Sequence, residues 1–159
     1  MAGEKSSGFF KLYDPYDLLR KLEHDLDRLK ADPTDSYAAF DFFVTATHMP
    51  DWIRVIRWPF SAPTTGSRTA AIFELCGKLG NGGKHFVLHK KFDAPTEVRE
   101  PGPFMPSGAL TFAVGGLDVV LDTQDAAVLG RGRITALELA TEIYEFWSAD
   151  LNSRLTRLE

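Results

Sequence analysis

Residues 110–121, with the sequence LTFAVGGLDVVL, decide the predicted fold class, because hydrophobic residues alternate on both sides of a glycine pair. A two-residue turn at Gly115 and Gly116 would pair Phe112 with Val119 and place the alternate apolar side chains on one face. The stretch therefore predicts an antiparallel β-hairpin over about residues 109–122.

A second stretch with the period of a strand lies earlier in the chain. Phe86, Leu88 and Phe92 alternate with more polar residues, as in a strand with one buried face. We expect a strand over about residues 84–92, which would complete a small antiparallel sheet with the hairpin. A loop rich in proline, residues 95–108, separates the two.

The two ends of the chain carry the clearest helix signals. Asp14 followed by Pro15 predicts the start of a first helix, which the Asp32–Pro33 pair ends. A stripe of leucines along it suits helix-on-helix packing. A last helix should begin at Thr135, because Thr135 and Glu138 have the spacing of a capping box.

Three more helices are predicted between these ends. They cover about residues 34–48, 51–58 and 67–79, and the first of them should bury Tyr37 and Phe40. Pro50 starts the second of these helices, and the glycine-rich residues 80–83 end the third.

The predicted fold is therefore α+β. It is a helical bundle of about four to five helices with a small antiparallel sheet and a C-terminal helix. No internal repeat or linker divides the chain, so residues 1–159 form one domain, with residues 1–8 disordered.

Composition favours a globular protein of the cytoplasm. Hydrophobic residues make up 44% of the 159 residues and charged residues 25%. The single cysteine, Cys76, excludes an internal disulfide and lies on an apolar stripe, which predicts a buried thiol. No signal-peptide pattern and no 18-residue apolar run occur, so no membrane partner is expected.

Charge is unevenly distributed along the chain, although the net charge is only −4. Residues 50–92 carry a balance of +5, and residues 93–159 carry −6. Two interpretations stay open: solvated surfaces in which the two regions attract each other, or a basic surface that binds anions.

Spacing excludes two common kinds of site. Residues 77–84 invite comparison with a phosphate-binding loop, but the glycines are one residue too far apart, and His85 stands where such loops need Ser or Thr. His85 and His89 would lie about 13 Å apart on a strand, too far to share one metal ion. We therefore expect no metal site and no bound cofactor.

A group of polar residues near hydrophobic stretches forms the candidate site. Asp41 and His48 fall seven positions apart, on the same face of a helix as Tyr37 and Val44. Burying either one unpaired would be costly, so each should have a partner. Two interpretations stay open: a structural network that ties helices to the sheet, or the lining of a cleft. The proposed cleft residues are Asp41, His48, Asp51, Asn81, Lys84 and His85.

Two segments carry a resemblance to other proteins. Residues 42–52, FFVTATHMPDW, and residues 81–86, NGGKHF, resemble small bacterial and phage-type proteins that share a helical FFVTA-H--DW pattern and a later N--KHF pattern. The likeness covers about residues 34–92 and the aromatic C-terminal helix. It implies no particular activity.

A second likeness is to the HEPN helical ribonucleases. Their motif is an arginine followed, after a short gap that contains a polar residue, by a histidine. Asn81 and His85 match the polar residue and the histidine. The arginine has no counterpart, because Leu79 and Gly80 precede Asn81.

Two functional hypotheses follow. The first is a non-enzymatic binding or regulatory protein, acting with a protein partner or as a homodimer. It rests on the lack of a complete catalytic motif and on aromatic residues in or near loops, which often anchor interfaces: Trp52, Trp58, Phe60 and Phe104. The alternative is a nucleic-acid-binding protein, with RNA cleavage as one form. Basic and aromatic residues alternate over residues 50–92, but the pI near 5.6 is low for such a protein.

Overall fold

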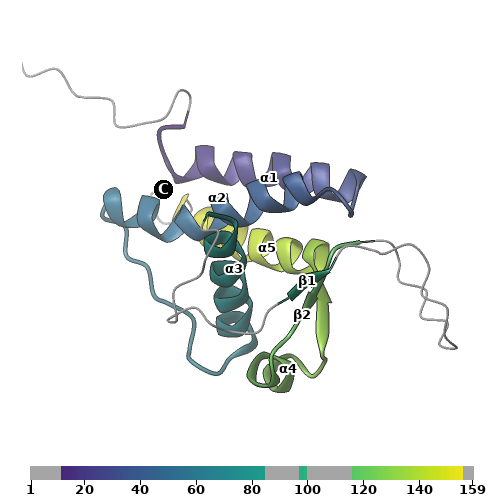
Figure 1. Cartoon of the computed structure of the whole chain (residues 1–159). Helices are drawn as coiled ribbons and strands as arrows, with labels where there is room; N and C mark the ends of the chain where they lie inside the picture. Colours follow the sequence, from purple (N-terminus) through teal and green to yellow (C-terminus); the bar gives the residue numbers. More distant parts are fainter. Residues whose placement is uncertain (1–11, 85–96, 100–115, 156–159) are drawn as a thin grey trace, which may run out of the picture.

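The computed structural model describes residues 12–84, 97–99 and 116–155 (Figure 1). Within them the chain forms five helices and three short strands. The helices are α1 (Pro15–Ala31), α2 (Ser36–Val55), α3 (Arg68–Lys84), α4 (Thr123–Leu129) and α5 (Ala136–Leu155), and the strands are β1 (Glu97–Arg99), β2 (Asp118–Val120) and β3 (Arg133–Thr135). The predicted α+β fold, with its helical bundle and C-terminal helix, is confirmed. The disorder predicted for residues 1–8 falls outside the described residues.

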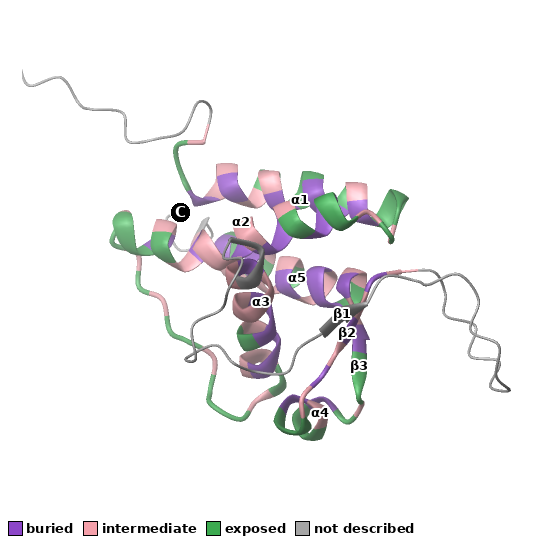
Figure 2. Cartoon of the chain, viewed as in Figure 1, coloured by how far each residue is buried: buried purple, intermediate pink, exposed green. Residues whose placement is uncertain are grey.

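The four long helices enclose one hydrophobic core. Figure 1 shows α1 and α2 side by side in opposite directions, with α3 crossing α2 steeply and α5 behind them. Their buried faces all point inward (Figure 2). The largest side chains of this core are almost inaccessible to solvent: Leu22, Leu26, Leu29, Phe42, Met49, Ile53, Leu75, Leu139, Ile143, Trp147 and Leu151. None of the helices in the described part of the chain combines the length and the apolar character needed to cross a bilayer.

The helix starts predicted at the two ends of the chain are confirmed. The Asp14 carboxylate accepts a hydrogen bond from the backbone N–H of Asp17 at 2.9 Å, and the Asp17 carboxylate accepts one from the N–H of Asp14 at 3.3 Å. At the start of α5, Thr135 Oγ1 accepts from the N–H of Glu138 at 3.1 Å, and Glu138 accepts from the N–H of Thr135 at 3.0 Å. These boxes satisfy N–H groups that a helix start leaves unpaired.

The small sheet differs from the predicted hairpin. It has the order β1–β2–β3 with antiparallel pairing, and Val119 in β2 lies between Val98 in β1 and Ile134 in β3. The predicted pairing of Val119 with Phe112 is therefore wrong. Residues 110–114 themselves lie outside the described part of the chain.

The backbone hydrogen bonds of Leu117 differ from those that the predicted turn requires. A two-residue turn would pair Leu117 with Val114. Instead, the Leu117 N–H donates to the Pro33 carbonyl at 3.1 Å, and its carbonyl accepts from the Ala136 N–H at 2.8 Å. Both bonds join segments that are distant in sequence, so local alternation could not reveal them. The strand predicted from residue 84 also starts too early, since Lys84 ends α3, and residues 85–96 lie outside the described residues.

Helix α2 is longer than predicted and buries a different face. It runs through Pro50 to Val55 as one helix, where a break had been expected. A proline inside a helix costs about 3 kcal/mol. The burial of Met49 and Ile53 on either side of it offsets that cost.

The expected apolar face of α2 is also partly wrong. Tyr37 and Phe40 are 79% and 46% exposed, while Phe42 and the small Ala38 and Ala39 are buried. Apolar residues occur around the whole start of this helix, so periodicity alone did not define its buried side.

Helix α3 continues through the glycines that were expected to end it, because one of them contacts α2 closely. A Cβ on Gly80 would lie only 2.6 Å from the Phe43 carbonyl oxygen and would also clash with the Thr47 side chain. Because Gly80 has no side chain, α3 and α2 can approach each other closely at this residue. Helix α3 ends at Lys84 instead of Leu79.

Two basic residues, Arg68 and Lys78, form ion pairs that join the basic middle of the chain to its acidic end, as one interpretation of the charge pattern predicted. Arg68 pairs with Glu142 at 2.6 Å on the surface. Lys78 is mostly buried and contacts Asp125 at 2.8 Å and Asp122 at 3.3 Å, which fixes α4 against α3. The N–H of Asp125 and the Lys78 ammonium lower the pKa of Asp122, so this carboxylate contributes stability that is lost as the pH falls.

A pair of glycine substitutions tests the close contact between α2 and α3. We expect Gly80→Ala to destabilise the protein by about 1–3 kcal/mol through overpacking, although alanine favours a helix. Gly77→Ala is the matched control on the same helix, because a Cβ there meets no heavy atom within 4 Å. It should stabilise by about 0.5–1 kcal/mol. Urea denaturation of both variants measures the difference, and equal effects would contradict the assigned contact.

A second pair of substitutions compares the buried and the exposed ion pair. Lys78→Met leaves the buried Asp125 without its cation and should cost about 3–5 kcal/mol. Arg68→Met, at an exposed pair, should cost at most about 1 kcal/mol. Thermal or chemical denaturation gives both values. A Lys78 effect as small as that of Arg68 would show that α4 is not anchored through this cluster.

Candidate functional site

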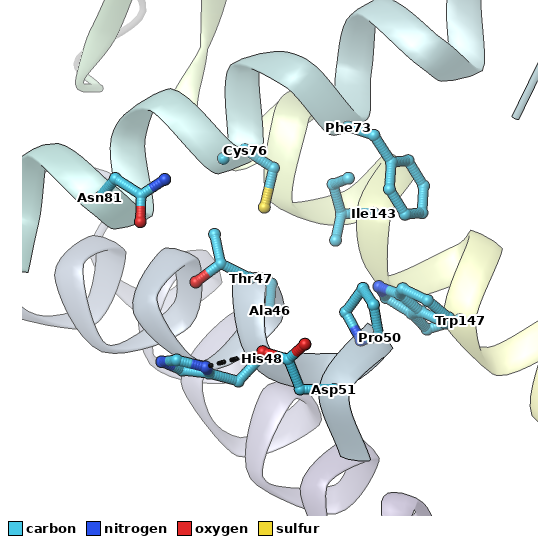
Figure 3. A pocket seen from close by; sticks show the side chains of 11 residues that line it. Ala46, Thr47, His48, Pro50, Asp51, Phe73, Cys76, Asn81, Ile143 and Trp147 are labelled. Carbon is cyan, nitrogen blue, oxygen red and sulfur yellow. Dashed lines mark ion pairs between the residues drawn. The ribbon is translucent and has the colours of Figure 1, made fainter. Parts of the chain in front are cut away.

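A pocket of about 240 Å³ lies between α2, α3 and α5 (Figure 3). Three helices that are distant in sequence therefore contribute to it. Its lining residues are Ala46, Thr47, His48, Pro50 and Asp51 from α2, Phe73, Cys76, Gly77 and Asn81 from α3, and Ile143 and Trp147 from α5.

Two residues with unusual backbone properties make room for the pocket. Gly77 has no side chain, and a Cβ built on it would meet open space. Pro50 interrupts the hydrogen-bond ladder of α2, because it has no N–H to donate to the carbonyl of Ala46. Both residues line the pocket, so the helices face each other there with less side-chain volume than elsewhere.

The closed end of the pocket is aromatic. Trp147 is only 1% exposed and packs against three rings, those of Phe60, Phe73 and Phe146, with centroid distances of 5.3, 5.4 and 5.1 Å. Such offset and edge contacts hold the indole ring in one orientation.

The indole nitrogen of Trp147 is buried without a hydrogen-bond acceptor. Among the described residues, it is the one buried side-chain nitrogen or oxygen that has no partner. Figure 3 shows this nitrogen on the edge of the ring that faces the other lining residues. An unpaired buried donor costs about 1–3 kcal/mol, so an acceptor that reached this nitrogen from the pocket would lower the energy of the folded protein.

Polar side chains of α2 and α3 form the rim. His48 Nδ1 and Asp51 Oδ2 are 3.6 Å apart, the pair joined by the dashed line in Figure 3. Asp51 also accepts a hydrogen bond from Arg54 at 2.8 Å through its other oxygen. The Thr47 hydroxyl donates to the Val44 carbonyl, so its oxygen remains able to accept.

Cys76 lies in the wall of the pocket, and the predicted buried thiol is confirmed. Burial raises the pKa of this thiol to about 12. The group is therefore a thiol at physiological pH, and a nucleophile would need the thiolate.

Three of the six predicted cleft residues meet at this pocket: His48, Asp51 and Asn81. The backbone of Lys84 lies in the last turn of α3, and His85 falls outside the described residues.

Asp41 does not belong with them. It lies two helical turns before His48 and contacts Arg28 of α1 at 2.7 Å. The sequence grouped Asp41 with the cleft residues, but its partner in the structure is Arg28, because α1 supplies a guanidinium on that side of α2. Asp41 and His48 are both partly exposed, where the sequence had placed them on or beside the buried stripe.

The residue that sequence reasoning missed is Trp147. In the sequence it is only one of the aromatic residues of the predicted C-terminal helix. Periodicity identifies a buried tryptophan but does not reveal whether its N–H has a partner. The usable signal was indirect: a proline and a glycine inside neighbouring helices, which reduce side-chain volume and hydrogen bonding at one place.

Within the described residues, no group of three or more histidine, cysteine, aspartate or glutamate side chains is arranged to hold a metal ion. Comparisons with protein-family models, curated proteins and solved structures find no match to this chain. The resemblance of residues 34–92 to small bacterial and phage-type proteins, and the HEPN likeness, therefore stay predictions.

The reactivity of Cys76 tests the described pocket wall. With a pKa of about 12, roughly one thiol in ten thousand is ionised at pH 8. We expect a disulfide reagent such as dithiobis(nitrobenzoate) to label the native protein at least about a hundredfold more slowly than the unfolded protein. The unfolded chain in guanidinium, with its single cysteine, is the internal control. Labelling at equal rates would show that Cys76 is accessible in the folded state.

Proposed function

We propose that this protein is a non-enzymatic binding or regulatory domain of the cytoplasm, and that the pocket between α2, α3 and α5 is its ligand site. The single observation that carries the proposal is the buried, unpaired indole N–H of Trp147 at the pocket. A folded protein rarely keeps such a donor without a reason, and a bound acceptor would supply its partner.

The character of the pocket supports binding over catalysis. Cys76 is protonated, so it offers no nucleophile. His48 and Asp51 are 3.6 Å apart and both about half exposed, unlike a catalytic pair, whose atoms are held at about 2.6–3.2 Å. Apolar groups with a few polar atoms are typical of sites that bind small molecules.

Nucleic-acid binding, the alternative, gains little support from the described residues. Of the basic side chains described between residues 50 and 92, Arg54, Arg68 and Lys78 each pair with a carboxylate. A surface that binds phosphates needs basic groups that carboxylates do not already neutralise. Arg57 has no such pair in the described part of the chain, and one cation makes no binding surface.

The structure also weakens one argument for the predicted homodimer, which was the presence of aromatic residues in or near loops. Trp52, Trp58 and Phe60, three of the aromatic residues that suggested an interface, are partly buried against the protein's own core. Phe104 lies outside the described residues. We propose a small molecule as the principal partner, and light scattering at high concentration would reveal a dimer.

A broad fragment screen tests the proposed function. The protein has three tryptophans, so a ¹⁵N-labelled sample should give three indole N–H signals in the NMR spectrum. Trp147→Phe identifies the signal from the pocket. We expect fragments that bind to shift this signal and to slow the labelling of Cys76, while the signal of Trp58, outside the pocket, stays in place. A large and chemically diverse screen that yields no such fragment would contradict the proposal.

A further inference from the structure

We infer that the pocket selects a small, uncharged, planar ring that carries a carbonyl group, with an aromatic primary amide as the simplest example. The inference rests on the proposed function and names the chemical class of its ligand. Three properties of the pocket lead to it: size, charge, and the positions of its hydrogen-bonding groups.

Size limits the ligand to about one ring with a substituent. An engineered cavity of about 150 Å³ in another protein holds benzene, and sites for drug-sized ligands usually exceed about 300 Å³. The volume of about 240 Å³ lies between these values. Phe73, Ile143 and Pro50 give the pocket apolar walls suited to a flat ring.

Charge favours a neutral molecule. Among the described residues, the lining includes no lysine or arginine, so a phosphate or carboxylate would meet no permanently charged cation there. Asp51 is the one carboxylate of the lining, and Arg54 and His48 lie against its two oxygens. A cationic ligand would therefore compete with these groups for a carboxylate that already has partners.

Hydrogen-bonding groups lie at opposite ends of the pocket. Figure 3 shows Trp147 with Phe73 at one end and Asn81 at the other, with Thr47 between them on the Asn81 side. The indole N–H can only donate, so the group it meets must be an acceptor. A carbonyl oxygen provides that acceptor without charge, and the NH₂ of an amide can donate to Asp51, Thr47 or Asn81.

Three probes of nearly identical shape separate the chemical alternatives. Benzamide is neutral with a carbonyl acceptor, benzoate is its anionic counterpart, and benzamidine is a cation that has no carbonyl. We expect benzamide to bind at least about tenfold more tightly than either charged probe, because benzoate would meet no permanently charged cation among the described lining residues and benzamidine would compete with Arg54 and His48 for Asp51. Titrations followed at the Trp147 indole N–H signal give the three dissociation constants.

Two substitutions locate the binding energy. Trp147→Phe keeps a ring but removes the donor and should weaken benzamide about five- to tenfold, with the affinity followed by the benzamide proton signals; Trp58→Phe, outside the pocket, should not. Gly77→Ala adds a methyl group to the pocket lining at a point where no other heavy atom lies within 4 Å. The methyl group would occupy space that the ligand needs and displace the ligand from its contacts, so benzamide binding should weaken at least about fivefold. Gly132→Ala, at another glycine with open space around it, is its matched control. The Gly77 variant keeps the test decisive if Trp147→Phe does not fold.

The results separate the ligand class from the proposed function. Tighter binding of benzamide that both pocket substitutions weaken supports the inference. Equal or tighter binding of benzoate or benzamidine, no binding of benzamide, or unchanged affinity in Trp147→Phe overturns it. If the broad fragment screen still finds ligands in this pocket, the proposed function stands while the class assigned here falls. If the screen finds none, both fall.

Discussion

The contact between α2 and α3 at Gly80 is the constraint on which the described structure depends most. Because Gly80 has no side chain, α3 lies directly against the backbone of Phe43 and the side chain of Thr47. That contact sets how α3 crosses the pair formed by α1 and α2, and it places Lys78 where it anchors α4. It also brings Asn81, the next residue of α3, beside the part of α2 that carries His48 and Asp51.

The same crossing creates the pocket. Gly80 and Gly77 lie three residues apart on α3, yet the first is filled by contact with α2 and the second faces open space. On α2, Pro50 lies three residues after Thr47 and lacks a backbone N–H. Each of the two helices therefore contributes to the lining one residue that lacks a group, the N–H of Pro50 on α2 and the side chain of Gly77 on α3. The aromatic face of α5 closes the site, because Phe146 and Phe73 hold Trp147 in place. A small space is thus left between α2, α3 and α5.

Features that depend on residues within four positions of each other were predictable from the sequence. The caps at Asp14 and Thr135 are examples, since each satisfies N–H groups of its own first turn. The errors at Gly80 and at Leu117 involve distant partners. The residues near Gly80 in the sequence do not predict its contact with Thr47, and those near Leu117 do not predict its hydrogen bonds to Pro33 and Ala136. Gly80 was interpreted as part of a helix end, and Gly115 and Gly116 as a turn, because these are the usual local roles of glycine and the sequence shows no distant contacts.

The candidate site follows the same division. His48 and Asp51 are three residues apart on one helix, so the sequence could place them together, whereas Asp41 found its partner, Arg28, on another helix. Trp147 is the instructive case. Its hydrophobic ring satisfies every rule for a core residue, and its unpaired N–H breaks the rule that buried polar groups are hydrogen-bonded. Proteins keep local inconsistencies of this kind mainly where function requires them. The unpaired N–H belongs to a residue that lines a pocket, and this position supports the binding role proposed for it.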